Sequence, residues 1–197
     1  MAKRPDKSAK IIDAALTLAA TRGWHELSLG DIATAAKVPL PDLAQLFPTK
    51  AAILAAWSRG LDGAVLALAE AEDLSGEGAR DRLFDVLMMR FDEMAAAKPA
   101  LVNIARDLRR DPVALLALVS PALQSLGWML EAAGIDSSGW RGALRVRGLG
   151  VIWARVFWVW LGDGGDQAKT MSELDRRLRQ AEDLLLAVSR FGARNQK

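Results

Sequence analysis

The sequence contains no cysteine and no tyrosine among its 197 residues, and His25 is its single histidine. Without cysteine there is no disulfide, no thiolate nucleophile and no thiolate metal ligand. One histidine argues against a histidine-based catalytic triad and against a multi-histidine metal centre. The sequence also lacks the glycine-rich phosphate loops of the P-loop and GxGxxG types. These absences predict a protein that is not an enzyme and carries no metal or cofactor.

A strong charge of one sign is also missing. Lys and Arg total 26 against 24 Asp and Glu, so the net charge of +2 permits contact with an anionic polymer without requiring it. The most apolar region is interrupted by four arginines between residues 141 and 155, so we expect no stable membrane insertion. No apolar run with a small-residue cleavage site follows the basic residues of Met1–Lys10, so we expect no secretory signal and a cytoplasmic protein.

Apolar residues recur at the three- and four-residue spacing of helices along almost the whole chain. Ser28, with Asp31 three residues later, matches a capping box, and Thr49 is placed to cap a long fourth helix. The strongest break is Leu74–Gly78, where we expect a linker or turn. No alternating run is long enough for a strand. We therefore predict an all-α fold of about nine helices, which cover approximately residues 8–22, 29–36, 41–47, 50–73, 79–97, 99–110, 112–133, 138–161 and 167–191.

The N-terminal part has two short helices joined by a tight turn and followed by a capped long helix, which is the layout of a DNA-reading helix-turn-helix. Its residues resemble those of the TetR family of bacterial regulators. The matching positions are Gly23-Trp24, Leu27-Ser28-Leu29, Asp31-Ile32-Ala33, Ala36, Val38, Leu43, Phe47-Pro48-Thr49-Lys50 and Ile53-Leu54. The resemblance implies a three-helix DNA-binding domain over residues 1–50 and a helical ligand-binding and dimerisation domain over residues 51–197.

In that family the third helix enters the major groove, which implies double-stranded DNA as a partner. The candidate DNA-binding residues are Lys37, Leu40, Asp42, Gln45 and Lys50. Lys37 and Lys50, with the N-terminal Lys3 and Arg4, are the candidates for phosphate contact. The chain departs from the family pattern at three positions, which carry Lys37 in place of glycine, Pro39 in place of serine or threonine, and Ala44 in place of tyrosine. The alternative is that these lysines are ordinary solvated side chains.

Two C-terminal segments are unusually rich in apolar surface. Leu149–Leu161 is apolar nearly all round, and the last helix carries an apolar stripe that begins at Met171. Such faces are buried either inside a bundle or against a partner. The TetR resemblance implies a homodimer through these two helices, whose two-fold symmetry suits an operator. The candidate dimer residues are Trp153, Val156, Trp160, Leu174, Leu178 and Leu185, and the alternative is that they belong to the internal core.

The resemblance also implies a ligand cavity among the middle helices, and their methionines would adapt to the irregular shape of an apolar guest. The candidate ligand-binding residues are Phe84, Met88, Phe91, Leu118, Trp128, Met129 and Trp153. Methionines and aromatic residues at helical spacing are also typical of an ordinary core, so that alternative stays open.

A second resemblance concerns Phe157–Glu182, which contains Trp160-Leu161, Asp163, Asp166, Thr170-Met171 and Leu174–Leu178. This stretch is similar to the C-terminal part of the ubiquinone-biosynthesis lipid-binding family, which shares the TetR-like fold. The leading hypothesis is a DNA-binding transcriptional repressor controlled by a small apolar ligand. The alternative is a lipid-binding accessory protein of ubiquinone biosynthesis that no longer reads DNA.

Overall fold

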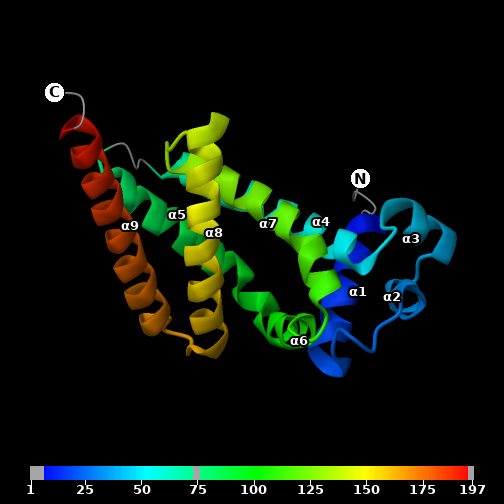
Figure 1. Cartoon of the computed structure of the whole chain (residues 1–197). Coiled ribbons are helices and arrows are strands. Elements are labelled where there is room, and N and C mark those ends of the chain that lie inside the picture. The colour runs from blue at the N-terminus through cyan, green and yellow to red at the C-terminus, as the bar shows by residue number, and fades with distance from the viewer. Residues whose placement is uncertain (1–6, 73–75, 195–197) are drawn as a thin grey trace. The chain divides into compact units, whose positions relative to one another are not determined.

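The computed structural model describes residues 7–72 and 76–194. Over these residues the chain forms nine α-helices and one short 3-10 helix, and it forms no strand (Figure 1). The predicted all-α fold of about nine helices is therefore confirmed. The helices are α1 (Lys7–Arg22), α2 (Leu29–Ala36), α3 (Leu40–Leu46), α4 (Lys50–Ala71), α5 (Ala79–Met94), the 3-10 helix η1 (Ala95–Ala97), α6 (Lys98–Leu108), α7 (Pro112–Ala132), α8 (Gly139–Gly162) and α9 (Ala168–Arg194).

Local signals in the sequence set the ends of the first helices. Gly23 follows α1 with a φ of +87°, a left-handed conformation that glycine adopts without steric cost. At the start of α2, Ser28 and Asp31 form the predicted capping box, with the Asp31 N–H donating to Ser28 Oγ over 3.0 Å. Thr49 accepts a hydrogen bond from the Ala52 N–H and so caps α4, as predicted. The predicted break at Leu74–Gly78 lies partly outside the described residues, and α5 begins directly after it at Ala79.

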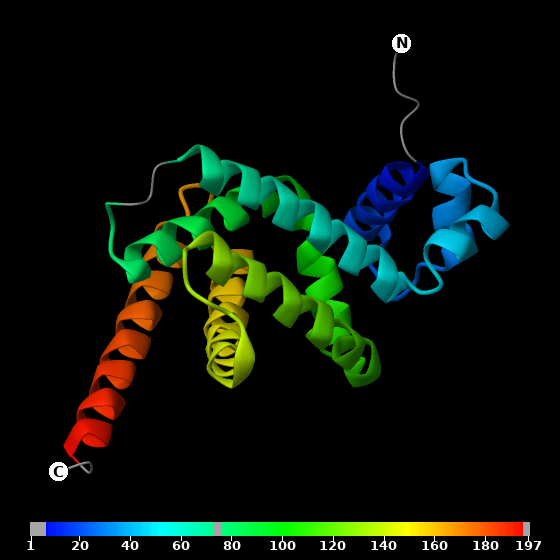
Figure 2. The same cartoon turned by 90° about the horizontal axis from the view of Figure 1, so that it is seen from above.

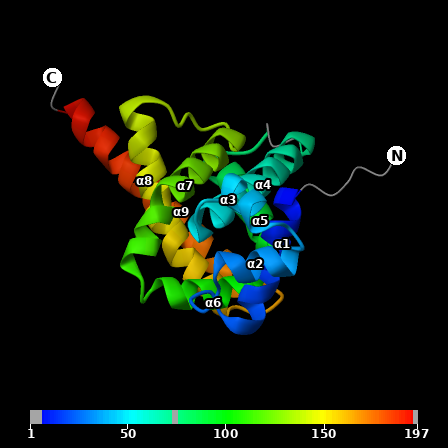
Figure 3. The same cartoon turned by 90° about the vertical axis from the view of Figure 1, so that its right-hand side faces the viewer.

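The chain divides into two compact units. Unit 1 consists of residues 1–64 and 93–125, and unit 2 consists of residues 65–92 and 126–197. In unit 1, α1 packs against α2 and α6, and α2 packs against α3; Figure 3 shows α1, α2 and α3 grouped together. Ile11, Ile32 and Leu43 are fully buried at the centre of this group. The predicted domain boundary at residue 50 stays a prediction.

Unit 2 is organised around α8 and α9, which run antiparallel and side by side (Figures 1 and 2). Its core contains an aromatic cluster in which the Phe91 ring stacks on Trp153 with 4.6 Å between ring centroids. Phe157 and Trp160 extend the cluster along α8. Pairs of aromatic rings at these separations contribute beyond their buried area. This cluster fixes one face of α8 inside the protomer.

Two helices, α4 and α7, are long and apolar enough to cross a membrane by length and composition. The expectation of no stable membrane insertion rests on the four arginines between residues 141 and 155, whereas Pro112–Leu130 of α7 contains no charged residue. The arginines of residues 141–155 interrupt α8 and have no bearing on α7. Buried helices of proteins without membrane spans meet the same criteria, so this finding is weak support for a membrane role.

Candidate nucleic-acid interface

Helix α3 turns one face toward the core of unit 1 and the opposite face toward solvent. Leu43 is fully buried, and Phe47 at the end of the helix is nearly so. Pro41, Ala44 and Gln45 are all exposed, and their spacing of three and four residues places them on one side of the helix. Because a single α-helix fits the major groove of DNA, this outer face has the shape of a reading surface.

Lys37 occupies the turn between α2 and α3 in a strained conformation. Its φ of 54° and ψ of 42° are left-handed, and its N–H caps α2 through the carbonyl groups of Ala33 and Thr34. A residue other than glycine pays about 1–2 kcal/mol for this conformation. The side chain is exposed, at a position where the TetR pattern has glycine. Contact of the Lys37 side chain with phosphate stays a prediction.

The other predicted DNA-binding residues of α3 lie in different surroundings. Leu40 is half exposed and Gln45 is exposed, so both are accessible to a ligand. Asp42 is ion-paired with Lys7 of α1, with 2.8 Å between Nζ and Oδ2. This pair compensates the one acidic side chain of α3, whose charge would otherwise repel phosphate. The proposed phosphate contacts of Lys3 and Arg4 lie outside the described residues.

Lys50 has an inward position that the sequence did not predict. Its Nζ donates to the carbonyl oxygens of Trp24 and Leu27 over 2.7 and 2.8 Å, and it lies 5.2 Å from the centroid of the Trp24 ring. Burial lowers the pKa of Lys50, and the carboxylates of Asp107 and Asp111 act in the opposite direction. An ammonium group has three donors, so one remains for a phosphate. Lys50 therefore secures the loop before α2, and its contact with DNA stays a prediction.

Helix α6 holds the helix-turn-helix from the side through two polar residues that the sequence analysis did not single out. Asn103 Nδ2 donates to the Ala19 and Ala20 carbonyls at the end of α1, over 3.0 and 3.1 Å. Asp107 Oδ2 accepts the His25 N–H over 2.8 Å, directly after the Gly23 turn. The two side chains thereby tie α6 to the last turn of α1 and to the segment that follows it. Their partners are more than eighty residues away in the sequence, so no local signal could have found them.

The predicted ligand-binding residues divide between the two units. Six of the seven belong to unit 2, and Leu118 belongs to unit 1. Phe91 and Met129 are fully buried, Trp128 is exposed, and the others are half-buried. Arg90 is buried beside this group, with its guanidinium carbon 5.5 Å from the centroid of the Trp153 ring. The structure thus brings Phe91 and Trp153 together, and the ligand role of these residues stays a prediction.

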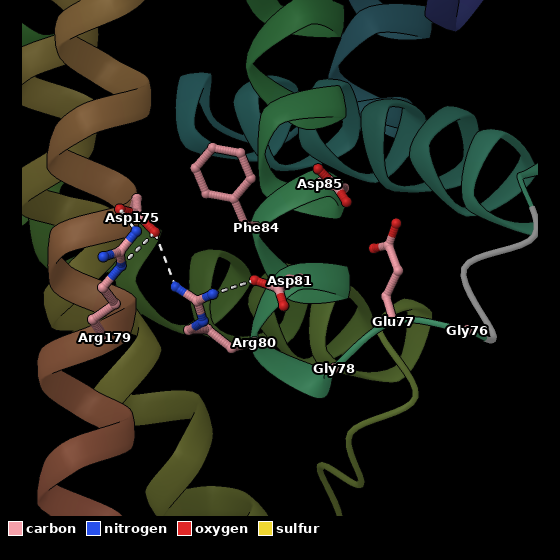
Figure 4. Close-up of a pocket in the computed structure, with 9 residues that line it drawn as sticks. All are labelled: Gly76, Glu77, Gly78, Arg80, Asp81, Phe84, Asp85, Asp175 and Arg179. Atoms are coloured by element: carbon pink, nitrogen blue, oxygen red, sulfur yellow. Dashed lines mark hydrogen bonds and ion pairs between the residues drawn. The ribbon is translucent and has the colours of Figure 1, made fainter.

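A cavity of about 600 Å³ lies in unit 2 between the start of α5 and α9 (Figure 4). Its walls are mostly charged, and Phe84 is the one predicted ligand residue among them. The Asp175 carboxylate forms ion pairs with the guanidinium groups of Arg80 and Arg179, with N–O distances of 3.0 and 2.8 Å. On the other side of α5, a hydrogen bond with Asp85 and the nearby carboxylates raise the pKa of Glu77. These walls are suited to a polar molecule and do not match an apolar guest.

The predicted dimer residues lie mostly inside the protomer. Val156, Trp160, Leu174 and Leu178 are buried in unit 2, Trp153 is half-buried, and the side chain of Leu185 lies outside those described. The opposite face of α8 instead carries four exposed apolar side chains, which we call the α8 stripe. They are Trp140, Leu144, Val151 and Trp158, with 74, 64, 74 and 43% of their surface exposed. Their spacing of four, seven and seven residues is helical and was visible in the sequence.

Comparison with known proteins identifies the N-terminal segment. Residues 11–57 match the family model of the bacterial regulatory proteins of the tetR family. A TetR transcriptional regulator from Nitrosomonas europaea has a similar structure, with a TM-score of 0.69 and 23% identity over 90% of this chain and 98% of that one. A TetR regulator from Rhodococcus sp. RHA1 gives a TM-score of 0.64 and 18% identity, over 88% and 94% of the two chains. Thermus thermophilus FadR, a repressor solved with lauroyl-CoA, gives a TM-score of 0.59 and 22% identity, over 87% of this chain and 91% of that one. A comparison with curated proteins found no match.

Within the described residues, the α1–α2–α3 group with its exposed third helix has the layout of a helix-turn-helix, the motif that places its last helix in the major groove of DNA. The family model matches the residues that build this group, and the fold of the described residues is shared with solved TetR regulators. The N-terminal segment of residues 11–57 is thus a DNA-binding segment of the tetR type.

Proposed function

We propose that the chain is a homodimeric repressor that binds an operator through α3 and releases it when a small apolar ligand binds the helical domain of residues 51–197. The observation that carries this proposal is the outer face of α3, which is exposed while its inner face is locked into unit 1 by Leu43. A reading helix must be held rigidly and still leave its outer face free for base edges. A protein with this role works where DNA is, so we place it in the cytoplasm.

Helix α6 supplies a route by which a ligand would act on the helix-turn-helix. Asn103 and Asp107 tie α6 to the end of α1 and to the turn after it through hydrogen bonds of 2.8–3.1 Å. A ligand that binds one arrangement of the helical domain more tightly shifts the population toward that arrangement. If α6 moves in this shift, its two polar links carry α1 along. The distance between the two α3 helices of a dimer then no longer matches the distance between the two half-sites of the operator.

The α8 stripe supports the homodimer, with a second copy of the chain as its partner. Two copies related by a two-fold axis bury the same surface on each side, so one apolar stripe is sufficient for both. A stable interface buries about 800 Å² on each partner, which requires contributions around the stripe as well as from it. Exposed apolar side chains of α9, such as Met171 and Leu184 on the two flanks of its buried side, are candidates for that addition.

The apolar character of the ligand rests on the aromatic residues of unit 2, chiefly Phe91, Trp153 and Phe157. The similar FadR of Thermus thermophilus was solved with lauroyl-CoA, so a protein of this fold holds a molecule with an apolar chain. Buried Arg90, beside Trp153, would add a positive charge to the end of such a site.

A gel-shift titration with the DNA upstream of the protein's own gene, at several salt concentrations and with unrelated DNA as competitor, tests the proposal. A repressor of this kind retains the upstream fragment specifically, and the affinity falls as salt rises because the release of counterions from the DNA, which favours binding, becomes less favourable at higher salt. Equal retention of both DNAs, or none, would contradict it. Addition of lauroyl-CoA or a free fatty acid then asks whether an apolar ligand releases the fragment.

One observation favours the lipid-binding accessory function as a second candidate. The first half of α7 is free of charge and exposes Val113, Leu115 and Leu116. An exposed apolar surface of this kind marks an interaction site for a lipid or another partner. Native mass spectrometry of the purified protein would show a co-purified isoprenoid lipid, together with no retention of any DNA, if this candidate is correct.

A further inference from the structure

The outer face of α3 is chemically unusual for a surface that meets DNA. Pro41 and Ala44 present apolar groups, Gln45 presents one amide, and exposed Leu40 adds a further apolar group at the first turn. The seven residues of α3 include no arginine, lysine or histidine. Direct contacts from this helix to base edges must therefore be apolar or made by the amide of Gln45.

The one charged residue of α3 is already engaged. Asp42 Oδ2 lies 2.8 Å from the Lys7 Nζ, and this ion pair joins α3 to α1. A carboxylate would otherwise accept a hydrogen bond from the N4 amino group of cytosine. The ion pair with Lys7 competes with that use, because it neutralises the carboxylate and holds Oδ2 toward α1. The pair also engages Lys7, the lysine of α1 that lies beside α3.

The four base pairs require different side chains in the major groove. Guanine is read by arginine or lysine at O6 and N7, and cytosine is read by a carboxylate at N4. Adenine is read by asparagine or glutamine at N6 and N7, and the C5-methyl group of thymine is met by apolar side chains. The outer face of α3 holds an amide and apolar groups, which read A·T pairs. It holds no arginine or lysine, and its one carboxylate is paired with Lys7.

We infer that α3 is a reader of A·T base pairs, in which Gln45 pairs with an adenine and Pro41 and Ala44 pack against thymine methyl groups. The inference rests on the proposed DNA-binding function and adds the chemical class of the operator's core. Its specificity comes from methyl burial and one bidentate amide, and G·C pairs have no partner on this helix.

Selection from a random 20-base-pair duplex pool with the full chain supplies the DNA for the test. We expect the enriched half-sites to contain A·T pairs at the central positions. Fluorescence anisotropy then compares the selected duplex with a copy in which one thymine at a time is replaced by uracil, which removes the C5-methyl group and keeps base pairing. Each methyl group that α3 contacts should cost about fourfold in affinity when removed.

The protein side of the test is Gln45→Ala, with Gln124→Ala as the matched control at an exposed glutamine of α7 in the same unit. Gln45→Ala should reduce the preference for adenine over guanine at one position by about 5- to 150-fold, and Gln124→Ala should leave it unchanged. Circular dichroism confirms that both variants keep the helical fold.

The outcomes separate the inference from the function on which it rests. Enrichment of half-sites with conserved G·C pairs, or affinities that are insensitive to uracil and to Gln45→Ala, would overturn the A·T reading while leaving a DNA-binding protein. A pool that yields no enriched sequence would overturn the proposed DNA-binding function itself, and the inference with it.

Discussion

The replacement Val151→Arg tests the proposed dimer at the centre of the α8 stripe. Val151 is 74% exposed in the protomer, so a partner can remove most of its surface from water. Full burial of a valine contributes about 1.5 kcal/mol or more, which gives about 2 kcal/mol for the two copies of Val151. Two guanidinium groups left without partners in the interface cost at least about 1–3 kcal/mol more. The sum of about 3–5 kcal/mol corresponds to a dimer Kd that is weaker by about 100-fold to several thousand-fold.

Sedimentation velocity over a range of protein concentrations measures this change. The matched control is Val113→Arg, which makes the same replacement at a valine of α7 that is 78% exposed. We expect the wild-type chain and Val113→Arg to sediment as dimers and Val151→Arg as a monomer with an unchanged circular dichroism spectrum. A dimeric Val151→Arg would refute the assignment of the interface to the α8 stripe. Dissociation of Val113→Arg alone would move the interface to α7.

Three further replacements test single contacts of the helix-turn-helix. Asn103→Ala removes two hydrogen bonds to the end of α1 and should lower the free energy of unfolding by about 1–2 kcal/mol in urea titrations, whereas no change would show that the link is idle. Lys37→Gly relieves left-handed strain and should raise the free energy of unfolding by about 1 kcal/mol. If Lys37 contacts phosphate in both copies, the same replacement reduces the slope of log affinity against log salt by about 1.8, from 0.9 for each contact, and an unaltered slope would exclude that contact. Hydrogen bonds from Ser28 lower the pKa of Asp31 below its ordinary 3.8, so its stabilisation is present above that pH and is lost as the pH falls through the lowered value. Asp31→Asn should therefore be less stable than wild type at pH 7 and approach it in acid, and a difference that is constant with pH would contradict the capping role.

The sequence predicted the helices well because their ends carry strong local signals. Ser28 and Asp31 start α2 through contacts three residues apart, Gly23 ends α1, and Pro112 begins α7. Such interactions are decided within one or two turns of the chain, so the spacing of residue types is sufficient to find them.

The site was less predictable because it depends on contacts distant in the sequence. Periodicity cannot choose the buried face of the Leu149–Leu161 segment of α8, which is apolar nearly all round, and the aromatic cluster with Phe91 makes that choice. Lys50 turns inward because its ammonium group donates to the Trp24 and Leu27 carbonyls, which only the folded chain brings near it. Asn103 likewise meets its partners only when α6 packs on α1.

Hydroxyl-radical footprinting of the full chain on the bound duplex tests most directly whether α3 reads DNA. The account predicts two protected segments whose centres lie about 10 base pairs, or a multiple of this, apart. Ala44→Glu, which introduces a negative charge at an exposed position of the reading face, should abolish both while the protein stays folded. Uniform cleavage with the wild-type chain, or protection that survives Ala44→Glu, would contradict the account.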